Sequence, residues 1–206
     1  MYQLIEEASK ILRTPPAVFD FEVRADAKEV EERLSEAMDR FGGIGLSANQ
    51  VGLDARVFMM RTQDGNQAFF NPELIKMSQE TDLMKEGCLS FPDIYLMIKR
   101  SKVIELKYQD AEGNTNTTML DGLGSRCAQH EVDHLNGIIF LQRASQLKIE
   151  RALKSRPKER KKRLDYEKRQ AVAKYIQSVQ SAKDADADGT GIETLNTLPQ
   201  NTSASS

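Results

Sequence analysis

The chain has 206 residues and a net charge of −2; 39% of the residues are hydrophobic and 29% charged, which suits one soluble globular domain with a solvated appendage. No apolar run approaches the length of a membrane span, so the composition argues against an integral membrane protein. The N-terminal sequence MYQLIEEASKIL lacks the features of a targeting segment, and two cysteines are too few for a disulfide framework, so we expect a cytoplasmic protein without membrane association.

The first strong pattern along the chain is helical. Apolar residues recur at helical spacing from Val30 to Phe41, and the glycine pair that follows stops the pattern. Asp26 and Glu29 lie where residues that cap a helix N-terminus are expected. We therefore predict a helix that faces the core over this stretch.

Short runs of β-forming residues come next, with turn signals such as DGN and EGN among them. These runs cover residues 56–61, 67–70 and 102–108. From Asp121 to Leu135 the spacing of apolar residues is helical again, and Asn136-Gly137 ends it. The elements predict an α+β fold, with mostly antiparallel β-sheets around a central helix over 121–135.

The C-terminal part differs from the rest in charge. Residues 1–147 contain 16 basic and 23 acidic side chains, whereas residues 148–206 contain 13 and 8. We assign 1–147 to the main domain, 148–180 to a basic helical extension that Pro157 ends or kinks, and 181–206 to a disordered tail. The excess of positive charge in the extension favours a polyanionic partner.

Both histidines of the chain lie in one string, His130-Glu131-Val132-Asp133-His134. Residues four apart share one face of an α-helix, so the two imidazoles can bind one metal ion. The HExxH pattern on a helix is typical of a hydrolytic metal centre, with the glutamate beside the water that the ion activates. The string therefore predicts a metal-dependent hydrolase.

A third ligand is needed, because catalytic centres of this kind usually take three protein ligands. Cys127 lies on the same helix as His134 but about 10.5 Å away along the axis, while metal bonds are only about 2.0–2.3 Å long. Cys88 lies in an extended or turning segment, EGCLSFP, that a fold could place against the helix, so it is the better ligand. A downstream carboxylate such as Glu150 is the alternative, and it would indicate a zincin-type protease.

Three strings together resemble the signature segments of peptide deformylases, in the same order and at similar separations. They are GIGLSANQ at 43–50, EGCLS at 86–90 and QHEVDH at 129–134. The resemblance spans about residues 11–142. It implies a metal-dependent hydrolase that removes the N-formyl group from the N-terminal formylmethionine of nascent polypeptides and releases formate. Two alternatives are an HExxH zinc protease and an inactive homologue that acts as a ribosome-binding module.

By this resemblance, Cys88, His130 and His134 hold one divalent metal ion. Ferrous iron is the ion that the family leads us to expect. A thiolate with two imidazoles suits zinc equally well, and nickel or cobalt are further alternatives.

The resemblance also assigns the remaining site residues. Glu131 acts as general base and then acid, while the side-chain amide of Gln50 and the backbone N–H of Leu89 stabilise the oxyanion. Glu86 orients one ligating histidine through its other ring N–H, with Arg100 as its partner. The positions assigned to substrate binding are Gly43, Ile44, Gly45, Glu86, Gly87, Leu123, Arg126 and Cys127.

Some of these positions concern the fit of the substrate. Gly43 and Gly45 lack side chains that would keep a peptide away, so we expect the substrate to pair with this segment as an added strand. Arg126 departs from the apolar residue that the family pattern has in the methionine pocket, so either its aliphatic stem lines the pocket or the specificity is altered. Tyr95 stands where many bacterial members have an arginine that contacts substrate, and Ser47 replaces a common alanine.

The basic extension has two interpretations. Between Lys148 and Arg169 there are eleven basic and four acidic residues, and a solvated helix accounts for most of these charges. The sharper hypothesis is a ribosome-binding element that attracts ribosomal RNA. The expected partners are therefore N-formylmethionyl nascent peptides and, through residues 148–169, the ribosome.

Overall fold

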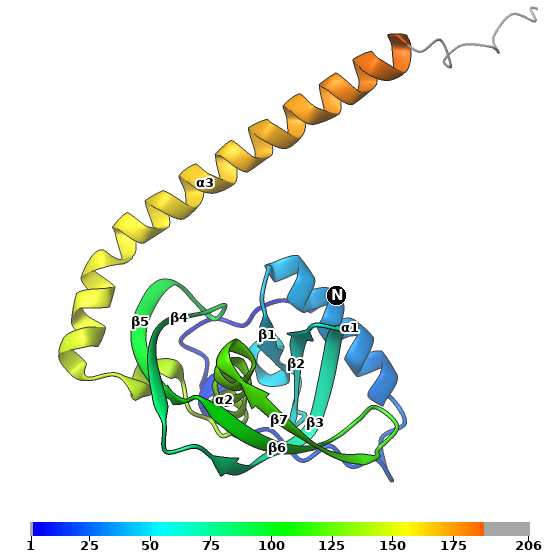
Figure 1. Cartoon of the computed structure of the whole chain (residues 1–206), viewed down its shortest axis with the longest axis vertical. Coiled ribbons are helices and arrows are strands. Elements are labelled where there is room, and N and C mark those ends of the chain that lie inside the picture. The colour runs from blue at the N-terminus through cyan, green and yellow to red at the C-terminus, as the bar shows by residue number, and fades with distance from the viewer. Residues whose placement is uncertain (1, 188–206) are drawn as a thin grey trace, which may run out of the picture. The chain divides into compact units, whose positions relative to one another are not determined.

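The computed structural model describes residues 2–187 (Figure 1). Its strands form a five-stranded antiparallel sheet, ordered β1-β2-β3-β6-β7, and a separate two-stranded sheet of β4 and β5. The strands are β1 (Gly45–Ser47), β2 (Val57–Thr62), β3 (Gly65–Met77), β4 (Thr81–Cys88), β5 (Phe91–Ser101), β6 (Val103–Gln109) and β7 (Thr115–Asp121). The helices are α1 (Ala27–Phe41), α2 (Gly122–Leu135) and α3 (Gln146–Ala187), with short 3-10 helices η1 (Lys10–Arg13), η2 (Ala48–Val51) and η3 (Phe140–Arg143). The predicted α+β class is confirmed, and the HExxH string lies on α2.

Strand β2 is buried on both faces because a helix covers each side of the larger sheet. Val57 and Met59 belong to the core cluster that contains the buried residues of α1, whereas Phe58 and Met60 belong to the cluster of α2. Successive side chains of a strand point to opposite faces of its sheet. Helices α1 and α2 therefore lie on opposite faces, and α2 takes a central place in the domain (Figure 1).

Helix α1 begins after Asp26 and ends before Gly42, close to the predicted bounds. Gly42 has φ +68°, a left-handed conformation, and its N–H donates to carbonyl oxygens of the last turn. Asp26 occupies the N-cap position as predicted, but its side chain makes no capping hydrogen bond. Both of its carboxylate oxygens instead accept hydrogen bonds from the guanidinium of Arg24.

The β4–β5 hairpin contributes to a core of its own. Ile94, Leu96 and Ile98 alternate with exposed residues along β5 and pack with Phe140 of η3 and Ala152 of α3. The hairpin shares no strand pairing with the five-stranded sheet. Side-chain contacts must therefore hold it against α2.

Helix α3 is continuous through Pro157, so of the two effects predicted for this proline the end of the helix is wrong, and the kink stays a prediction. Strong helix formers such as lysine, arginine and glutamate surround the proline and continue the helix on both sides. The chain divides into two compact units, residues 1–160 and 161–206. The first turns of α3 belong to the first unit, where Arg156 forms an ion pair with Glu7.

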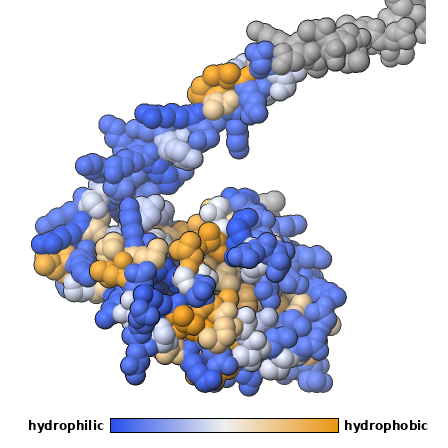
Figure 2. All heavy atoms as spheres, in the orientation of Figure 1, coloured by the Kyte–Doolittle hydropathy of each residue, from blue (hydrophilic) through white to orange (hydrophobic). Residues whose placement is uncertain are grey.

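Beyond residue 160, α3 is mainly hydrophilic, with a few apolar side chains gathered near its C-terminal end (Figure 2). Val172, Tyr175 and Ile176 are all exposed there. The tail predicted over residues 181–206 begins within this helix. Residues 188–206 of that prediction lie outside the described residues. Among residues 2–187, no helix is both long enough and apolar enough to cross a membrane.

Candidate metal centre

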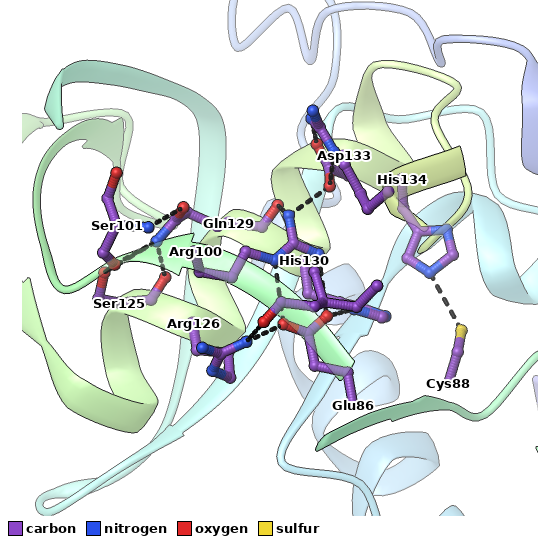
Figure 3. Close-up of polar contacts among 12 residues, drawn as sticks. Glu86, Cys88, Arg100, Ser101, Ser125, Arg126, Gln129, His130, Asp133 and His134 are labelled. Atoms are coloured by element: carbon purple, nitrogen blue, oxygen red, sulfur yellow. Dashed lines mark hydrogen bonds and ion pairs between the residues drawn. The ribbon is translucent and has the colours of Figure 1, made fainter. Parts of the chain in front are cut away.

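Three side chains that can bind a metal converge where the end of β4 meets α2 (Figure 3). The ligand atoms of Cys88, His130 and His134 all lie within 4.8 Å of one another, and Cys88 Sγ is 3.2 Å from His134 Nε2. The histidines come from successive turns of α2, as their spacing predicts. Cys88 ends β4, just after an irregularity in its pairing with β5.

This donor set fits a tetrahedral divalent ion. Bonds of about 2.0–2.3 Å from an ion to thiolate and imidazole ligands place the ligand atoms roughly 3.3–3.8 Å apart. The spacing of the three side chains is close to this range. Thiolate and imidazole ligands together suit zinc or iron, so the residues present fit a metal of this class.

The two alternative ligands lie elsewhere. Cys127 is buried, and its Sγ contacts the carbonyl oxygen of Ile44 at 3.5 Å. Glu150 lies on α3, where its carboxylate accepts a hydrogen bond from Gln146. In the described part of the chain, neither residue belongs to the group that could hold an ion.

Glu86 contacts one of the histidines directly. Its Oε2 lies 3.2 Å from His130 Nδ1, and its two oxygens each accept a hydrogen bond of 3.0 Å from Arg100. Burial alone would raise the pKa of Glu86, but the hydrogen bonds from His130 and Arg100 lower it to about 2. The carboxylate is thus ionised at neutral pH, and its contact with Nδ1 can hold the His130 ring in one orientation.

The two histidines have opposite electrostatic environments. Burial alone would lower the pKa of His130, but hydrogen bonds with Cys88 and Glu86 raise it to about 10. Burial, together with the positive charges of His130 and Arg100, lowers the pKa of His134 well below its usual value. His134 is therefore neutral at pH 7, the form that binds a metal.

Glu131 lies in the interior, with 4% of its surface exposed, between the two histidines on α2. Its Oε2 has no hydrogen-bond partner in the part of the chain that the structure describes. Burial raises the pKa of Glu131 to about 7. A carboxylate with an unused oxygen and a pKa near neutrality can accept and return a proton.

The side chain of Gln50 is held in one orientation. Its Oε1 accepts hydrogen bonds from the backbone N–H and the hydroxyl of Ser47, each at 2.9 Å. Its Nε2 therefore points toward Ser90 Oγ at 3.1 Å and Cys88 Sγ at 3.5 Å. This amide is a donor already aimed at the metal-binding group, and the backbone of Leu89 follows directly after Cys88.

Gly43 and Gly45 of the GIG segment both lie in close contact with neighbouring side chains. A Cβ on Gly45 would lie 2.5 Å from Glu131 Oε1 and 2.5 Å from Cys127 Sγ. A Cβ on Gly43 would lie 2.9 Å from the side chain of Leu89. Close packing against Glu131 and Cys127 thus disfavours any side chain at Gly45, whereas a side chain at Gly43 would have to displace the end of the Leu89 side chain.

The residues assigned to the methionine pocket divide into two groups. Ile44 and Leu123 are exposed apolar side chains, while Cys127 beside them is buried. Arg126 is buried too, and its guanidinium turns to the carboxylate of Glu86 at 2.5 Å (Figure 3). Its charged end is therefore paired within the protein.

Two further positions singled out in the sequence, Gly87 and Tyr95, lie on the two strands of the β4–β5 hairpin. A Cβ on Gly87 would lie 2.8 Å from the ring of Tyr95, so the tyrosine packs directly over this glycine. The Nζ of Lys85 lies 4.3 Å from the centre of the same ring, a cation–π contact. Tyr95 thus presents an aromatic ring and a neighbouring positive charge beside the strand that carries Cys88.

Several residues around the site were not predicted from the sequence. Asp133 accepts hydrogen bonds from Arg100 and Arg143, and Asn49 donates to the carbonyl oxygen of His134 at 2.7 Å. The pairing of Ser47 with Gln50 had a signal, because Ser-x-x-Gln is the pattern of a capping box. The other contacts join segments far apart in the chain and have no local pattern.

Comparison with known proteins identifies a family for this chain. A family model described as polypeptide deformylase matches residues 1–150. The peptide deformylase of Thermotoga maritima is 40% identical over 151 residues, which cover 72% of this chain and 90% of that protein. The peptide deformylase of Rhodopseudomonas palustris strain BisB18 is 36% identical over 151 residues, 70% of this chain and 86% of that protein.

Solved structures agree with the sequence relatives. The crystal structure of the Thermotoga maritima peptide deformylase matches with a TM-score of 0.67 and 39% identity, covering 70% of this chain and 98% of that one. A peptide deformylase from Synechococcus elongatus, solved in complex with actinonin, matches with a TM-score of 0.70 and 30% identity, covering 76% and 86%.

Proposed function

Since this chain belongs to the polypeptide deformylase family, whose members are metal-dependent hydrolases, we propose that it deformylates N-formylmethionyl peptides at the site formed by Cys88, His130 and His134. The observation that carries the proposal is the convergence of these three ligands beside Glu131, with Gln50 aimed at them. The products are formate and a peptide with a free N-terminus.

The proposed cofactor is ferrous iron, supported by the family resemblance, and the same ligands suit zinc, nickel or cobalt. A divalent ion held there supplies Lewis-acid activation of water near neutral pH. Cys88, His130 and His134 bind it from two elements, while Glu86 keeps the His130 ring in orientation.

Three protein groups act on the substrate in this proposal. Glu131 takes a proton at its carboxylate from the attacking water and returns it to the leaving amine. Gln50 Nε2 and the backbone N–H of Leu89 donate hydrogen bonds to the formyl oxygen as negative charge develops on it. The Ser47 contacts support the role of Gln50, because they fix its amide before substrate arrives.

The proposed substrate site lies along two strands. β1 lies at an edge of the larger sheet and β4 pairs only with β5, so in the described residues each has an edge without a strand partner. A peptide can add as a strand at such an edge, with its backbone beside Gly43–Gly45 and Glu86–Gly87. The exposed side chains of Ile44 and Leu123, together with Cys127 and the stem of Arg126, would receive the methionine.

Formate release tests the function. The metal-loaded protein should release formate from a formyl-Met peptide and leave the acetylated form of the same peptide intact. A longer unformylated peptide serves as the control for internal cleavage. Absence of formate release would overturn the proposal, and cleavage within the longer peptide would favour the zinc protease instead.

We also propose that the protein acts in the cytoplasm and meets nascent chains at the ribosome through residues 148–169. Lys154, Lys158, Lys161 and Lys168 have exposed side chains on α3, as attraction to ribosomal RNA requires. Changing these four lysines to glutamate should abolish cosedimentation with ribosomes at low salt and leave formate release from free peptides unchanged. Cosedimentation equal to that of the wild type would contradict ribosome binding by this segment. The substitutions are preferable to truncation after 147, because Ala152 and Arg156 are packed into the catalytic unit.

A further inference from the structure

Strand pairing does not set the position of Cys88 relative to the two histidines. Cys88 comes from the β4–β5 hairpin, whereas His130 and His134 come from α2. The hairpin forms a sheet of its own and shares no strand pairing with the larger sheet. Side chains between the hairpin and α2 must therefore set the distance from the thiolate to the imidazoles.

One set of contacts ties β5 to the later part of α2. Arg100 of β5 donates to the carboxylate of Asp133 at 2.5 Å, and its NH1 lies 3.5 Å from the carbonyl oxygen of Gln129 (Figure 3). The side chain of Gln129 donates to the carbonyl oxygen of Ser101 and accepts from its N–H. These contacts hold the C-terminal end of β5.

Arg126 makes the reverse connection, from α2 to both strands of the hairpin. Its guanidinium donates to the carbonyl oxygen of Ile98 on β5 at 3.0 Å and to that of Asp82 on β4 at 2.9 Å. It also donates to Glu86 Oε1 at 2.5 Å. The whole residue is only 7% exposed, so water competes little for these bonds.

Glu86 connects the two arginines to the metal ligand His130. Arg126 and Arg100 hold its Oε1, while Arg100 and His130 Nδ1 contact its Oε2. The two arginines thus fix the carboxylate, and the carboxylate in turn fixes the ring of a metal ligand. Arg126 is the one of the two that starts on the helix of the histidines.

We propose that Arg126 is a positioning residue of the metal centre, which fastens the hairpin that carries Cys88 to α2 and holds Glu86 against His130. The inference rests on the proposed function of that site. A lysine cannot replace it fully, because a single ammonium cannot reach two carbonyl oxygens and a carboxylate in the fixed directions of a guanidinium.

The test measures how firmly the free protein holds a metal. Cobalt-loaded full-length wild type, Arg126→Leu and Arg126→Lys are mixed with a chelator, and the loss of the cobalt–thiolate absorption is followed without substrate. Arg126→Leu should release cobalt about 10–100-fold faster than the wild type, the range found when groups that orient a metal ligand are removed, with Arg126→Lys between them. In turnover, kcat should fall while the KM for a formyl-Met peptide stays nearly constant.

Arg24→Leu is the matched control, because Arg24 also makes a bidentate pair with a carboxylate, Asp26, but far along the chain from the metal ligands. It should lower the melting temperature without changing cobalt release. Release from Arg126→Leu at the wild-type rate would overturn the inference; if that variant does not fold, an unchanged rate for Arg126→Lys would do so. A wild type that holds no cobalt would overturn the proposed function as well.

Discussion

The Sγ of Cys88 lies 3.2 Å from the Nε2 of His134, although 46 residues separate the two in the chain. The contact joins a strand of the small hairpin to the central helix. It brings the better of the two sulfur candidates to the histidines and leaves Cys127 outside their group.

The two cysteines should therefore respond differently to substitution. Cys88→Ser should lose the bound metal, because it removes one of three ligands, whereas Cys127→Ser should retain about one ion per chain. Metal content after gel filtration measures both. Equal metal loss from the two variants would show that Cys127 takes part in binding.

Gln50→Ala should lower kcat by about 10²–10³, the usual loss when one oxyanion donor is removed, without loss of metal. Ser47→Ala should have a smaller effect in the same direction, because the backbone N–H of residue 47 still holds Gln50 Oε1. Gln67→Ala, which removes a hydrogen bond to Tyr108, is the control and should leave kcat unchanged. An unimpaired Gln50→Ala enzyme would remove this residue from the mechanism.

Gly45→Ala should lose most activity, since the added Cβ would lie 2.5 Å from Glu131 Oε1 and must displace that carboxylate or the strand. Gly124→Ala is the matched control within α2, because its Cβ would make only ordinary contacts of 3.8–4.0 Å with Leu120. That change should raise the free energy of unfolding by roughly 0.5–1 kcal/mol, as alanine does in a helix. Steady-state kinetics and urea unfolding separate the two outcomes. A fully active Gly45→Ala would mean that the segment adapts without moving Glu131.

Glu31 on α1 predicts a dependence of stability on pH away from the metal centre. Burial raises its pKa above the usual 4.5, so the folded protein disfavours the ionised form. As pH rises through the unfolded-state value, the unfolded chain loses this proton first and stability falls until the pH passes the folded-state pKa. Glu31→Gln should therefore be more stable than the wild type at pH 7, with the difference vanishing below about pH 4.

Urea unfolding at the two pH values measures this difference. Glu32→Gln is the neighbouring control, and its effect should be similar at both because that side chain is exposed. A stability gain for Glu31→Gln that is the same at both pH values would contradict the assignment to ionisation.

Local patterns predicted three elements closely. Helix α2 and the strands β2 and β6 follow the predicted bounds within a residue or two, because helical spacing or runs of β-forming residues mark them and turn signals bound them. Strand β4, TDLMKEGC, has a largely exposed and charged sequence, so its pattern does not indicate a strand. It is ordered by pairing with β5, which cannot be deduced from its own residues.

In the site, too, some residues have a recognisable local sequence pattern and others depend on the folded structure. HExxH and the EGCLS string identified the ligands, because the chemistry requires those residue types at those positions. The pairing of Arg100 with Glu86 was predicted, but the buried positions and partners of Arg126 and Asp133 were not. Charged residues usually lie at the surface, and their pairing across three elements appears only when the chain is folded.

The most direct test of the central claim is formate release by Glu131→Gln compared with the wild type, each carrying a measured equivalent of metal. Glutamine keeps the size of the side chain and leaves the three ligands in place, but it cannot accept the proton. The variant should bind metal as the wild type does and release formate from a formyl-Met peptide about 10²–10⁴-fold more slowly. Metal-loaded Glu131→Gln that releases formate at the wild-type rate would contradict the account.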